Sequence, residues 1–204
     1  HRTRFSTGQR GGPGMLLSEH RRSLDPILAV ANQLAYGGRL LPRRGRRSRS
    51  PFPALGYGHI PTHELRRIGS SPCNPPEAGV IARWIGENRQ RLLDAYPEAE
   101  GNLGAILAVI TPFQGQARSI RSALRAHKLP EAGSRHGGLL VGTPRDLLGA
   151  DRPVVLFSTT YHGTYGGKPF FDQGPHLLNT VLTHTADSFL LFGDLELLDP
   201  QGQR

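Results

Sequence analysis

Cysteine, methionine and tryptophan are almost absent from this chain of 204 residues, since each occurs only once. Because Cys73 is the only cysteine, no disulfide can form within the chain. Long apolar runs are absent too, and stretches such as "AILAVI" are far shorter than the ~20 residues that a bilayer-spanning helix needs. The first residues also lack the apolar segment of a signal peptide. These absences predict a cytoplasmic protein without a membrane partner.

Lysine and acidic residues are scarce in the first third of the chain, where arginine is abundant. Residues 1–70 hold 13 Arg, no Lys and three acidic residues, and residues 71–204 are close to neutral. The segment 39–49 alone carries six Arg. Guanidinium groups suit phosphate, although a solvated loop has the same composition, so both interpretations stay open. The candidate contacts with single-stranded nucleic acid in this segment are Arg43, Arg44, Arg46 and Arg47.

Several catalytic motifs are missing from the sequence. No phosphate-binding loop of the form GxxxxGK[ST] occurs, and Lys128 and Lys168 are the only lysines. There is no HExxH, CxxC or GxSxG motif, and the nine His show no metal-ligand spacing around the single cysteine. The sequence therefore lacks a self-sufficient catalytic set, and no metal site is expected.

The N-terminal third shows little regular periodicity. Residues 1–15 are rich in Gly and Arg, which predicts a basic tail before one domain over residues 16–204. Apolar residues then recur at helical spacing, which predicts a helix capped by Asp25. Residues 42–76 contain seven Pro and most of the Arg cluster. We interpret them as a long, disordered loop with one weak strand near residues 54–60.

From residue 77 onward, helical patterns alternate with short apolar runs. Helices are predicted over residues 76–96, 115–129 and from 177 onward. Buried strands are predicted at residues 104–113, 137–143, 153–161 and 188–194. Strands that are apolar throughout and alternate with helices favour an α/β fold, a mainly parallel sheet with helices on both faces. In such sheets, functional residues commonly lie at the carboxyl ends of the strands.

Five segments occur in the order seen in a known protein family. The stretch "LLSEHRRSLDPILAVANQLAYGGRL" resembles the arginine-bearing helix that opens the second, C-terminal RecA-like domain of superfamily 1 helicases. "NPPEAGVIARWI" and "AVITPFQGQARSIRSAL" are similar to the family's Asn-x-x-Glu-Ala helix start and its Thr-Pro-aromatic-x-x-Gln segment. "VGTPRDLLGADRPVVLFS" and "LNTVLTHTADSFLLFGD" resemble its motifs V and VI. The similarity is greatest to the nonsense-mediated-decay and Okazaki-fragment helicases, and it implies a RecA-like fold of the P-loop NTPase superfamily that lacks the phosphate loop.

The resemblance implies a site that two domains share. In that family, ATP with Mg²⁺ lies between two RecA-like domains, and arginines of the second domain stabilise charge on the transferring phosphoryl group. The resemblance makes Arg22 the catalytic arginine of the opening motif, and His184 stands where motif VI has its arginine. The cofactor contacts that it implies are Gln116, Gly149 and Asp151. The nucleic-acid contacts that it implies at strand ends are Thr111, Pro112 and Thr143.

Motifs V and VI depart from the family pattern in this chain. Leu148 replaces the motif V glutamine, Asp151 its glutamate, and His184 the motif VI arginine. A histidine with a pKa near ~6.5 is mostly neutral at pH 7, so it cannot replace a permanently charged guanidinium. The alternative role for His184 is to cap the C-terminal end of its helix.

The leading hypothesis is the C-terminal half of a DNA or RNA helicase-like ATPase. Such a half would bind ATP with Mg²⁺ and single-stranded nucleic acid only together with an N-terminal RecA-like domain, in cis or in trans. The isolated chain is expected to need no cofactor and to hydrolyse no ATP. The alternative is a decayed, non-catalytic helicase domain that acts as a nucleic-acid-binding or scaffold module, and a third hypothesis is a reading frame not selected for function. Aromatic residues that either stack on bases or pack on the sheet are Tyr161, Tyr165, Phe170 and Phe171.

Overall fold

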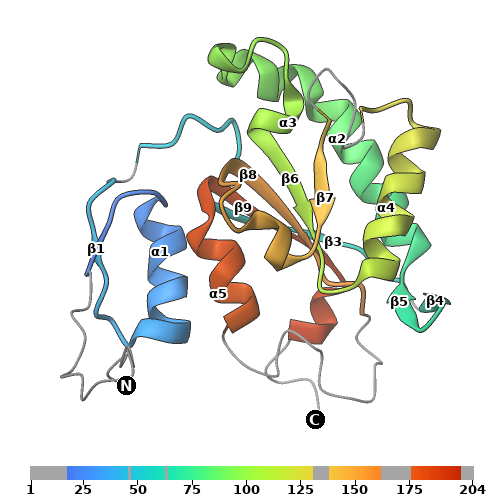
Figure 1. The fold of residues 1–204 in the computed structure, drawn as a ribbon, viewed down its shortest axis with the longest axis horizontal. Coiled ribbons are helices and arrows are strands. Elements are labelled where there is room, and N and C mark those ends of the chain that lie inside the picture. Colours follow the sequence, from blue (N-terminus) through green and yellow to red (C-terminus); the bar gives the residue numbers. More distant parts are fainter. Residues whose placement is uncertain (1–17, 46, 63, 131–137, 162–175, 199–204) are drawn as a thin grey trace, which may run out of the picture.

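The computed structural model describes five stretches of the chain, which Figure 1 draws in colour. They cover residues 18–45, 47–62, 64–130, 138–161 and 176–198. The basic tail predicted for residues 1–15 lies outside these described residues. No helix within the described stretches combines the length and the apolar character that crossing a membrane requires.

Five parallel strands form the central sheet, in the order β3-β9-β8-β6-β7 (Figure 1). The strands are β3 Leu55–His59, β6 Leu107–Ile110, β7 Leu140–Gly142, β8 Arg152–Ser158 and β9 Thr185–Gly193. The continuous apolar runs in β6 and β8 are typical of strands that are covered on both faces. The predicted α/β fold with a mainly parallel sheet is therefore confirmed.

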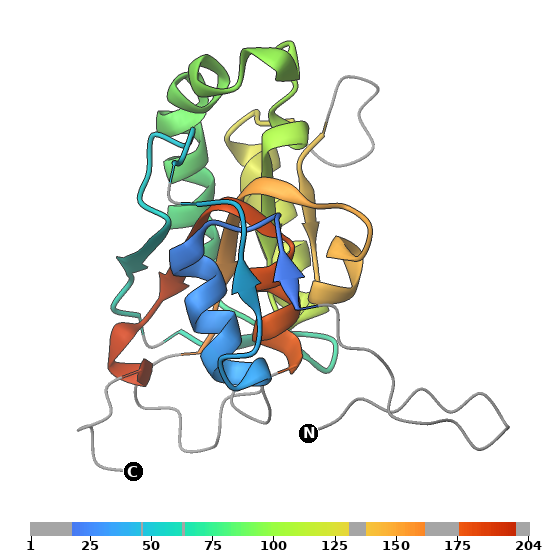
Figure 2. The ribbon, with the colours of Figure 1, turned by 90° about the vertical axis from the view of Figure 1, so that its left-hand side faces the viewer.

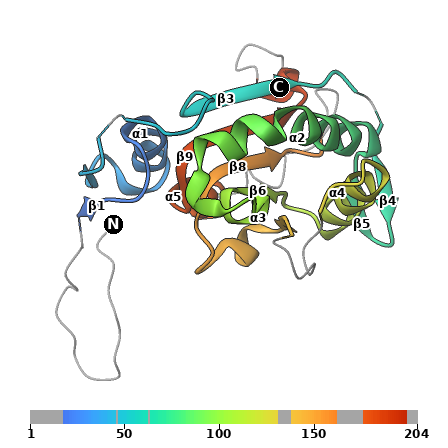
Figure 3. The ribbon, with the colours of Figure 1, turned by 90° about the horizontal axis from the view of Figure 1, so that it is seen from above.

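Helices cover both faces of this sheet, as the sequence predicts. Seen from above, α2 and α4 lie on one side of the sheet, and α1 and α5 on the other (Figure 3). The helices are α1 Asp25–Ala31, α2 Pro75–Ala95, α4 Gln114–Ala126 and α5 His176–Thr183. Side chains of β8 alternate between two cores, because Val154 and Leu156 pack with α2 and α4, whereas Val155 and Phe157 pack with α1 and α5.

Shorter elements flank the main helices and strands. β1 (Glu19–His20) pairs in parallel with β2 (Leu41–Pro42), and the pair lies beside α1 (Figure 2). α1 continues as a π-helical turn over Asn32–Tyr36. The helical turn α3 (Leu103–Ile106) precedes β6, so the strand predicted over residues 104–113 begins later than expected. The 3₁₀ turns are Pro97–Ala99, Pro144–Leu147 and Leu195–Leu198.

The segment 42–76, predicted as a long loop, contains ordered strands. The weak strand expected near residues 54–60 is present as β3 at the edge of the sheet. The antiparallel hairpin of β4 (Arg66–Ile68) and β5 (Ser71–Cys73) is not expected, so the loop interpretation is wrong there. β3 has a weak sequence signal because a glycine stands at every second position, where β9 side chains pack closely. A Cβ atom on Gly58, for example, would lie 2.8 Å from the ring of Phe192.

Arg44 anchors the arginine-rich segment to the sheet. Its Nη2 atom pairs with the Asp187 carboxylate at 2.5 Å, and the Asp187 side chain is only 3% exposed. Its Nη1 atom donates to the main-chain oxygens of Arg22, at 2.6 Å, and of Ala186. Tyr96 completes the cluster because its hydroxyl donates to Asp187 Oδ2 at 2.7 Å. Burial, followed by the contact with Asp187, raises the pKa of Tyr96 well above its usual value.

A second buried carboxylate, Glu77, lies at the opposite end of the sheet. Asn74 caps α2 by accepting a hydrogen bond from the Glu77 main-chain N–H at 3.1 Å. The Glu77 carboxylate accepts hydrogen bonds from Ser158 Oγ and, at 3.1 and 3.2 Å, from the Thr160 main-chain N–H. The Gln116 side chain links Asn74 to Ser158. It accepts a hydrogen bond from the Asn74 main-chain N–H at 2.7 Å and donates one to Ser158 Oγ at 3.0 Å. Burial raises the pKa of Glu77 to about 8, against the lowering effect of these hydrogen bonds.

Replacing Glu77 by Gln is expected to remove one pH dependence of stability. Folding raises the pKa of Glu77 from 4.5 to about 8, so the folded chain binds this proton more tightly than the unfolded chain does. The stabilisation is fully present below the lower value and is lost as the pH rises toward the higher one. The free energy of unfolding should fall across this window by up to about 1.4 kcal/mol per pH unit. Urea unfolding at several pH values in the window measures the slope.

A matched control for this experiment is Glu87→Gln, because Glu87 is an exposed carboxylate of the same helix. The control should keep the slope of the native chain. A Glu77→Gln variant with the native slope would contradict the raised pKa.

Replacing Arg44 by Ala is expected to destabilise the fold strongly. The change leaves the Asp187 carboxylate buried without its cation, and the removal of one partner of a buried ion pair costs about 3–5 kcal/mol. Arg43→Ala is the control, because Arg43 pairs with Glu19 at an exposed position, where a pair contributes about 0–1 kcal/mol. Chemical denaturation of both variants measures the difference. Equal losses would show that the Arg44–Asp187 pair has no special role.

Candidate functional site

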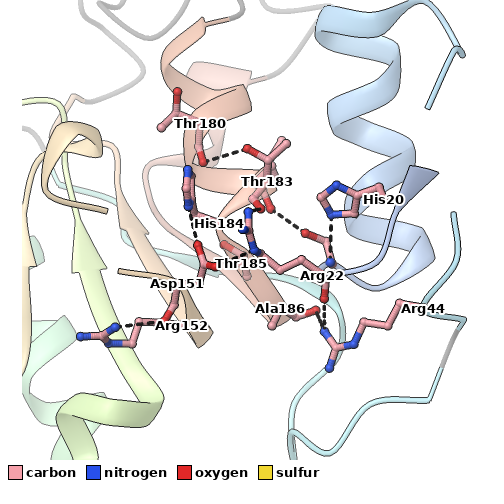
Figure 4. A network of polar contacts seen from close by, with 12 residues as sticks. His20, Arg22, Arg44, Asp151, Arg152, Thr180, Thr183, His184, Thr185 and Ala186 are labelled. Atoms are coloured by element: carbon pink, nitrogen blue, oxygen red, sulfur yellow. Dashed lines mark hydrogen bonds and ion pairs between the residues drawn. The ribbon is translucent and has the colours of Figure 1, made fainter. Parts of the chain in front are cut away.

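Three residues that are distant in sequence meet at the amino ends of β8 and β9 (Figure 4). Arg22 lies between β1 and α1, Asp151 directly precedes β8, and His184 lies between α5 and β9. The Asp151 carboxylate contacts both other side chains, with Oδ2 2.6 Å from Arg22 Nε and Oδ1 2.5 Å from His184 Nδ1. Arg22 and His184, the two catalytic candidates, therefore both contact Asp151, which the sequence assigns to cofactor binding.

The main chain fixes the position of Arg22. The adjacent Ser23 hydroxyl donates to the main-chain oxygen of Leu182 at 3.2 Å, and the Leu24 N–H donates to that of Ala186 at 2.9 Å. Together with the hydrogen bond from Arg44, these contacts join the turn before α1 to the start of β9. The Arg22 side chain is thus attached to a backbone that packs on the sheet, although the side chain itself is 43% exposed.

His184 stands at the end of α5, and its main-chain N–H donates to the Thr180 oxygen at 3.2 Å. The side chain does not cap the helix end, because its Nδ1 atom contacts Asp151. Arg22 has that capping role instead, since its Nη1 atom donates to the main-chain oxygen of Thr183 at 3.0 Å. Arg22, rather than the His184 ring, therefore caps the C-terminal end of α5.

His20 is a member of this cluster that sequence reasoning missed. Its Nε2 atom accepts a hydrogen bond from the Ser23 N–H at 2.9 Å. Burial and then the nearby Arg22 charge lower the pKa of His20 below 6.5, while Asp151 opposes the shift. Burial and Arg22 therefore favour the neutral form of the His20 ring. Its place two residues before Arg22 is the only sequence signal that could have found it.

Gly149 lies two residues before Asp151, in an exposed turn with a φ of +78°. This left-handed conformation is one that glycine adopts without strain. No atom lies within 4 Å of the place where a Cβ would stand, so backbone conformation rather than space requires glycine here. Gly149 thereby shapes the turn that carries Asp151.

The other candidate contacts lie at the carboxyl ends of the strands. Thr111 follows β6 and is fully buried, with its hydroxyl 3.1 Å from that of Thr160. Thr143 follows β7, and its hydroxyl donates to Asp146 at 3.0 Å. Pro112 is partly exposed. Seven residues of β8 separate this edge from Asp151, a distance of roughly 20 Å at the usual rise per residue.

Two assignments made from the sequence need correction in view of these positions. Gln116 is fully buried in the Glu77 network at the carboxyl edge, so its side chain is not presented to a cofactor at the Arg22 cluster. Thr111 is buried too, so its hydroxyl is not presented to a nucleic acid. Neither fact is visible in a local pattern, because burial depends on elements that are distant in sequence.

Thr160 adopts a left-handed conformation with a φ of +72°, which is rare for a β-branched residue. The Glu77 carboxylate accepts its N–H, and Asn74 Nδ2 donates to its oxygen at 3.2 Å. The next residue, Tyr161, is 5% exposed and packs edge-on against Phe113 with the ring centroids 5.2 Å apart. Tyr161 is therefore a packed aromatic rather than an exposed stacking surface. The remaining aromatic candidates, Tyr165, Phe170 and Phe171, lie outside the described residues.

The arginine-rich segment lies near the Arg22 cluster, at the amino edge. Arg43 is half-exposed and pairs with Glu19 at 3.0 Å, and Arg47 is exposed. Arg44 is wrongly predicted as a nucleic-acid contact, because its guanidinium is engaged with Asp187 and two main-chain oxygens. Arg46 lies outside the described residues. Among the residues that the structure describes, no group of three or more His, Cys, Asp or Glu could hold a metal ion.

Comparisons with known proteins support a resemblance to helicases. A family profile described as "AAA domain" matches residues 3–196. The Danio rerio protein named "Putative helicase mov-10-B.1" is 26% identical over 164 residues, which are 70% of this chain and 15% of that protein. The chain thus spans only a small part of this relative.

One solved structure with a similar chain path is the C-terminal domain of a possible DNA helicase from Lactobacillus plantarum. It has a TM-score of 0.49 and 11% sequence identity, and the match covers 85% of this chain and 87% of that one. Because the family profile extends over nearly the whole sequence, the chain belongs to the AAA domain family.

Proposed function

We propose that the chain is the C-terminal half of a DNA or RNA helicase-type ATPase and binds ATP and nucleic acid only together with an N-terminal RecA-like domain. One observation carries this proposal. Arg22 and His184 come from opposite ends of the chain, yet both contact Asp151 on one partly exposed surface. A partly exposed guanidinium on a fixed backbone suits a phosphoryl group that another domain presents.

The chemistry of the Arg22 cluster fits one side of a phosphate site. Arg22 supplies a permanent positive charge, which stabilises the negative charge that develops during phosphoryl transfer. His184 can supply a hydrogen bond but is not permanently charged. ATP with Mg²⁺ brings the reactive phosphoryl group, and the partner domain would hold the metal ion, since the described part of this chain has no metal-binding group of its own. The isolated chain is therefore expected to hydrolyse no ATP.

The proposed nucleic-acid contacts form two separate surfaces. Pro112 and Thr143 lie at the carboxyl edge of the sheet, whereas Arg43 and Arg47 lie near the amino edge. The arginine-rich surface is suited to weak, sequence-independent contact with phosphates.

A second candidate function is a non-catalytic nucleic-acid-binding or scaffold module. The observation that favours it is the contact of Asp151 with both Arg22 and His184, in a chain where histidine stands at the motif VI arginine position. A phosphate site resembles a decayed one when histidine replaces one of its arginines and the remaining arginine, Arg22, pairs with a carboxylate of the same chain. ATPase measurements distinguish the two functions.

Replacing His184 by Arg should raise ATPase activity when the chain is joined to a first RecA-like domain that carries a phosphate loop and a magnesium site. The new guanidinium restores a fixed charge, and a finger of this kind is worth about 10³–10⁵ in rate. Recovery should be partial, at roughly tenfold or more, because Leu148 still stands where the family has a glutamine. The measurement is kcat of the native fusion, the His184→Arg fusion, and the fusion that also carries Arg22→Ala.

The gain should disappear in the fusion that also carries Arg22→Ala, because two cations that share one phosphoryl charge act as a unit. No gain from the arginine, or a gain that survives the loss of Arg22, would count against the proposed half-site.

Replacing Arg43, Arg46 and Arg47 by Ser, in the chain joined to a first RecA-like domain, should weaken binding to single-stranded nucleic acid and make it less dependent on salt. Each lost phosphate contact lowers the slope of log K against log salt by about 0.7 for single strands. Arg44 stays unchanged in this variant because it is structural. Fluorescence anisotropy with a labelled oligonucleotide at several salt concentrations measures the slope. An unchanged slope would assign nucleic-acid binding to the carboxyl edge or to neither surface.

A further inference from the structure

Asp151 contacts both residues that the proposed function assigns to the phosphoryl group. Its two carboxylate oxygens divide between them, Oδ2 contacting Arg22 and Oδ1 contacting His184. A carboxylate that accepts from a guanidinium and an imidazole occupies the place that an incoming phosphoryl oxygen needs. Building on the proposed half-site function, we propose that Asp151 is an internal counter-anion that keeps Arg22 and His184 engaged in the free chain, and that a phosphoryl group must displace it.

The exposure of the pair makes such displacement feasible. The Arg22 and Asp151 side chains are 43% and 38% exposed, and ion pairs at this exposure are weak. Asp151 also follows the turn at Gly149, which has a φ of +78°. No atom lies within 4 Å of the place where a Cβ of residue 149 would stand. A phosphoryl group carries more negative charge than a carboxylate and offers more acceptor oxygens, so it competes well for Arg22.

Arg22 remains in place when Asp151 leaves it. Its Nη1 atom still donates to the Thr183 oxygen, and Arg44 still holds its main-chain oxygen. Only the Nε contact is lost. Main-chain contacts therefore anchor Arg22 without competing with phosphate. The Asp151 carboxylate is the contact that does compete.

No other carboxylate contacts Arg22 or His184 in the part of the chain that the structure describes. The neighbouring Arg152 is a further cation, and its side chain donates to the main-chain oxygens of Gly104, at 2.6 Å, and of Asp151, at 3.0 Å. Burial and the nearby Arg22 lower the pKa of His20. Release of Arg22 and His184 thus depends on the Asp151 side chain.

The test is calorimetric titration of the isolated chain with inorganic pyrophosphate at low ionic strength. Asp151→Asn should bind pyrophosphate about fivefold more tightly, the change that follows from the removal of one like charge at a distance of ~4 Å in water. NMR signals of the Arg22 Nε–H should shift during the titration. The matched control is Glu19→Gln, because Glu19 is an exposed carboxylate that pairs with Arg21 and Arg43 but not with Arg22.

The control should change the affinity less than Asp151→Asn does, and Arg22→Ala should cancel the gain in a double variant. An equal gain in Glu19→Gln would overturn the proposal, because net charge alone would then explain the effect. If Asp151→Asn leaves the pyrophosphate affinity unchanged or lowers it, while Arg22→Ala weakens binding, the counter-anion role of Asp151 is wrong. The proposed phosphate site at Arg22 would still stand. If neither Arg22→Ala nor Asp151→Asn changes the affinity, the proposed phosphate site fails as well.

Discussion

The parallel pairing of β8 with β9 is the constraint on which both the fold and the Arg22 cluster depend. Arg152 pairs with Thr185 in this ladder, so the preceding residues, Asp151 and His184, lie side by side. The same pairing aligns the apolar residues of both strands with the helices on either face. A shift of one residue would turn these side chains to the opposite faces and would separate Asp151 from His184.

Two buried carboxylates hold the ends of this sheet by different means. Asp187, near the amino edge, pairs with the guanidinium of Arg44. Glu77, at the carboxyl edge, has only neutral donors, so burial outweighs its hydrogen bonds and raises its pKa to about 8. One carboxylate thus joins the arginine-rich segment to β9, and the other joins α2 to the end of β8. Each one supports an edge that carries candidate functional residues.

The separation of these edges gives the proposed function a spatial order. The groups that suit a phosphoryl ligand lie where β8 and β9 begin, and the partly exposed strand-end residues Pro112 and Thr143 lie where β6 and β7 end. Ligands at the two edges would not touch each other, so any coupling between them would pass through the sheet and its flanking helices. The counter-anion Asp151 belongs to the first edge only, and its release need not disturb the second.

The sequence by itself determined the α/β class, most of the helices and strands, and the candidate residues Arg22 and His184. These inferences depend on local apolar periodicity and on the order of motifs, and both can be recognised without knowledge of tertiary contacts. Only the tertiary structure decided that Arg44 pairs with the buried Asp187, that Gln116 belongs to the Glu77 network, and that Asp151 contacts both Arg22 and His184. It also placed β3, which the sequence predicted only as a weak strand, at the edge of the sheet beside β9, where its glycines fit against β9 side chains. The reason is physical: these contacts join residues between 33 and 143 positions apart, and no local pattern records which of them meet.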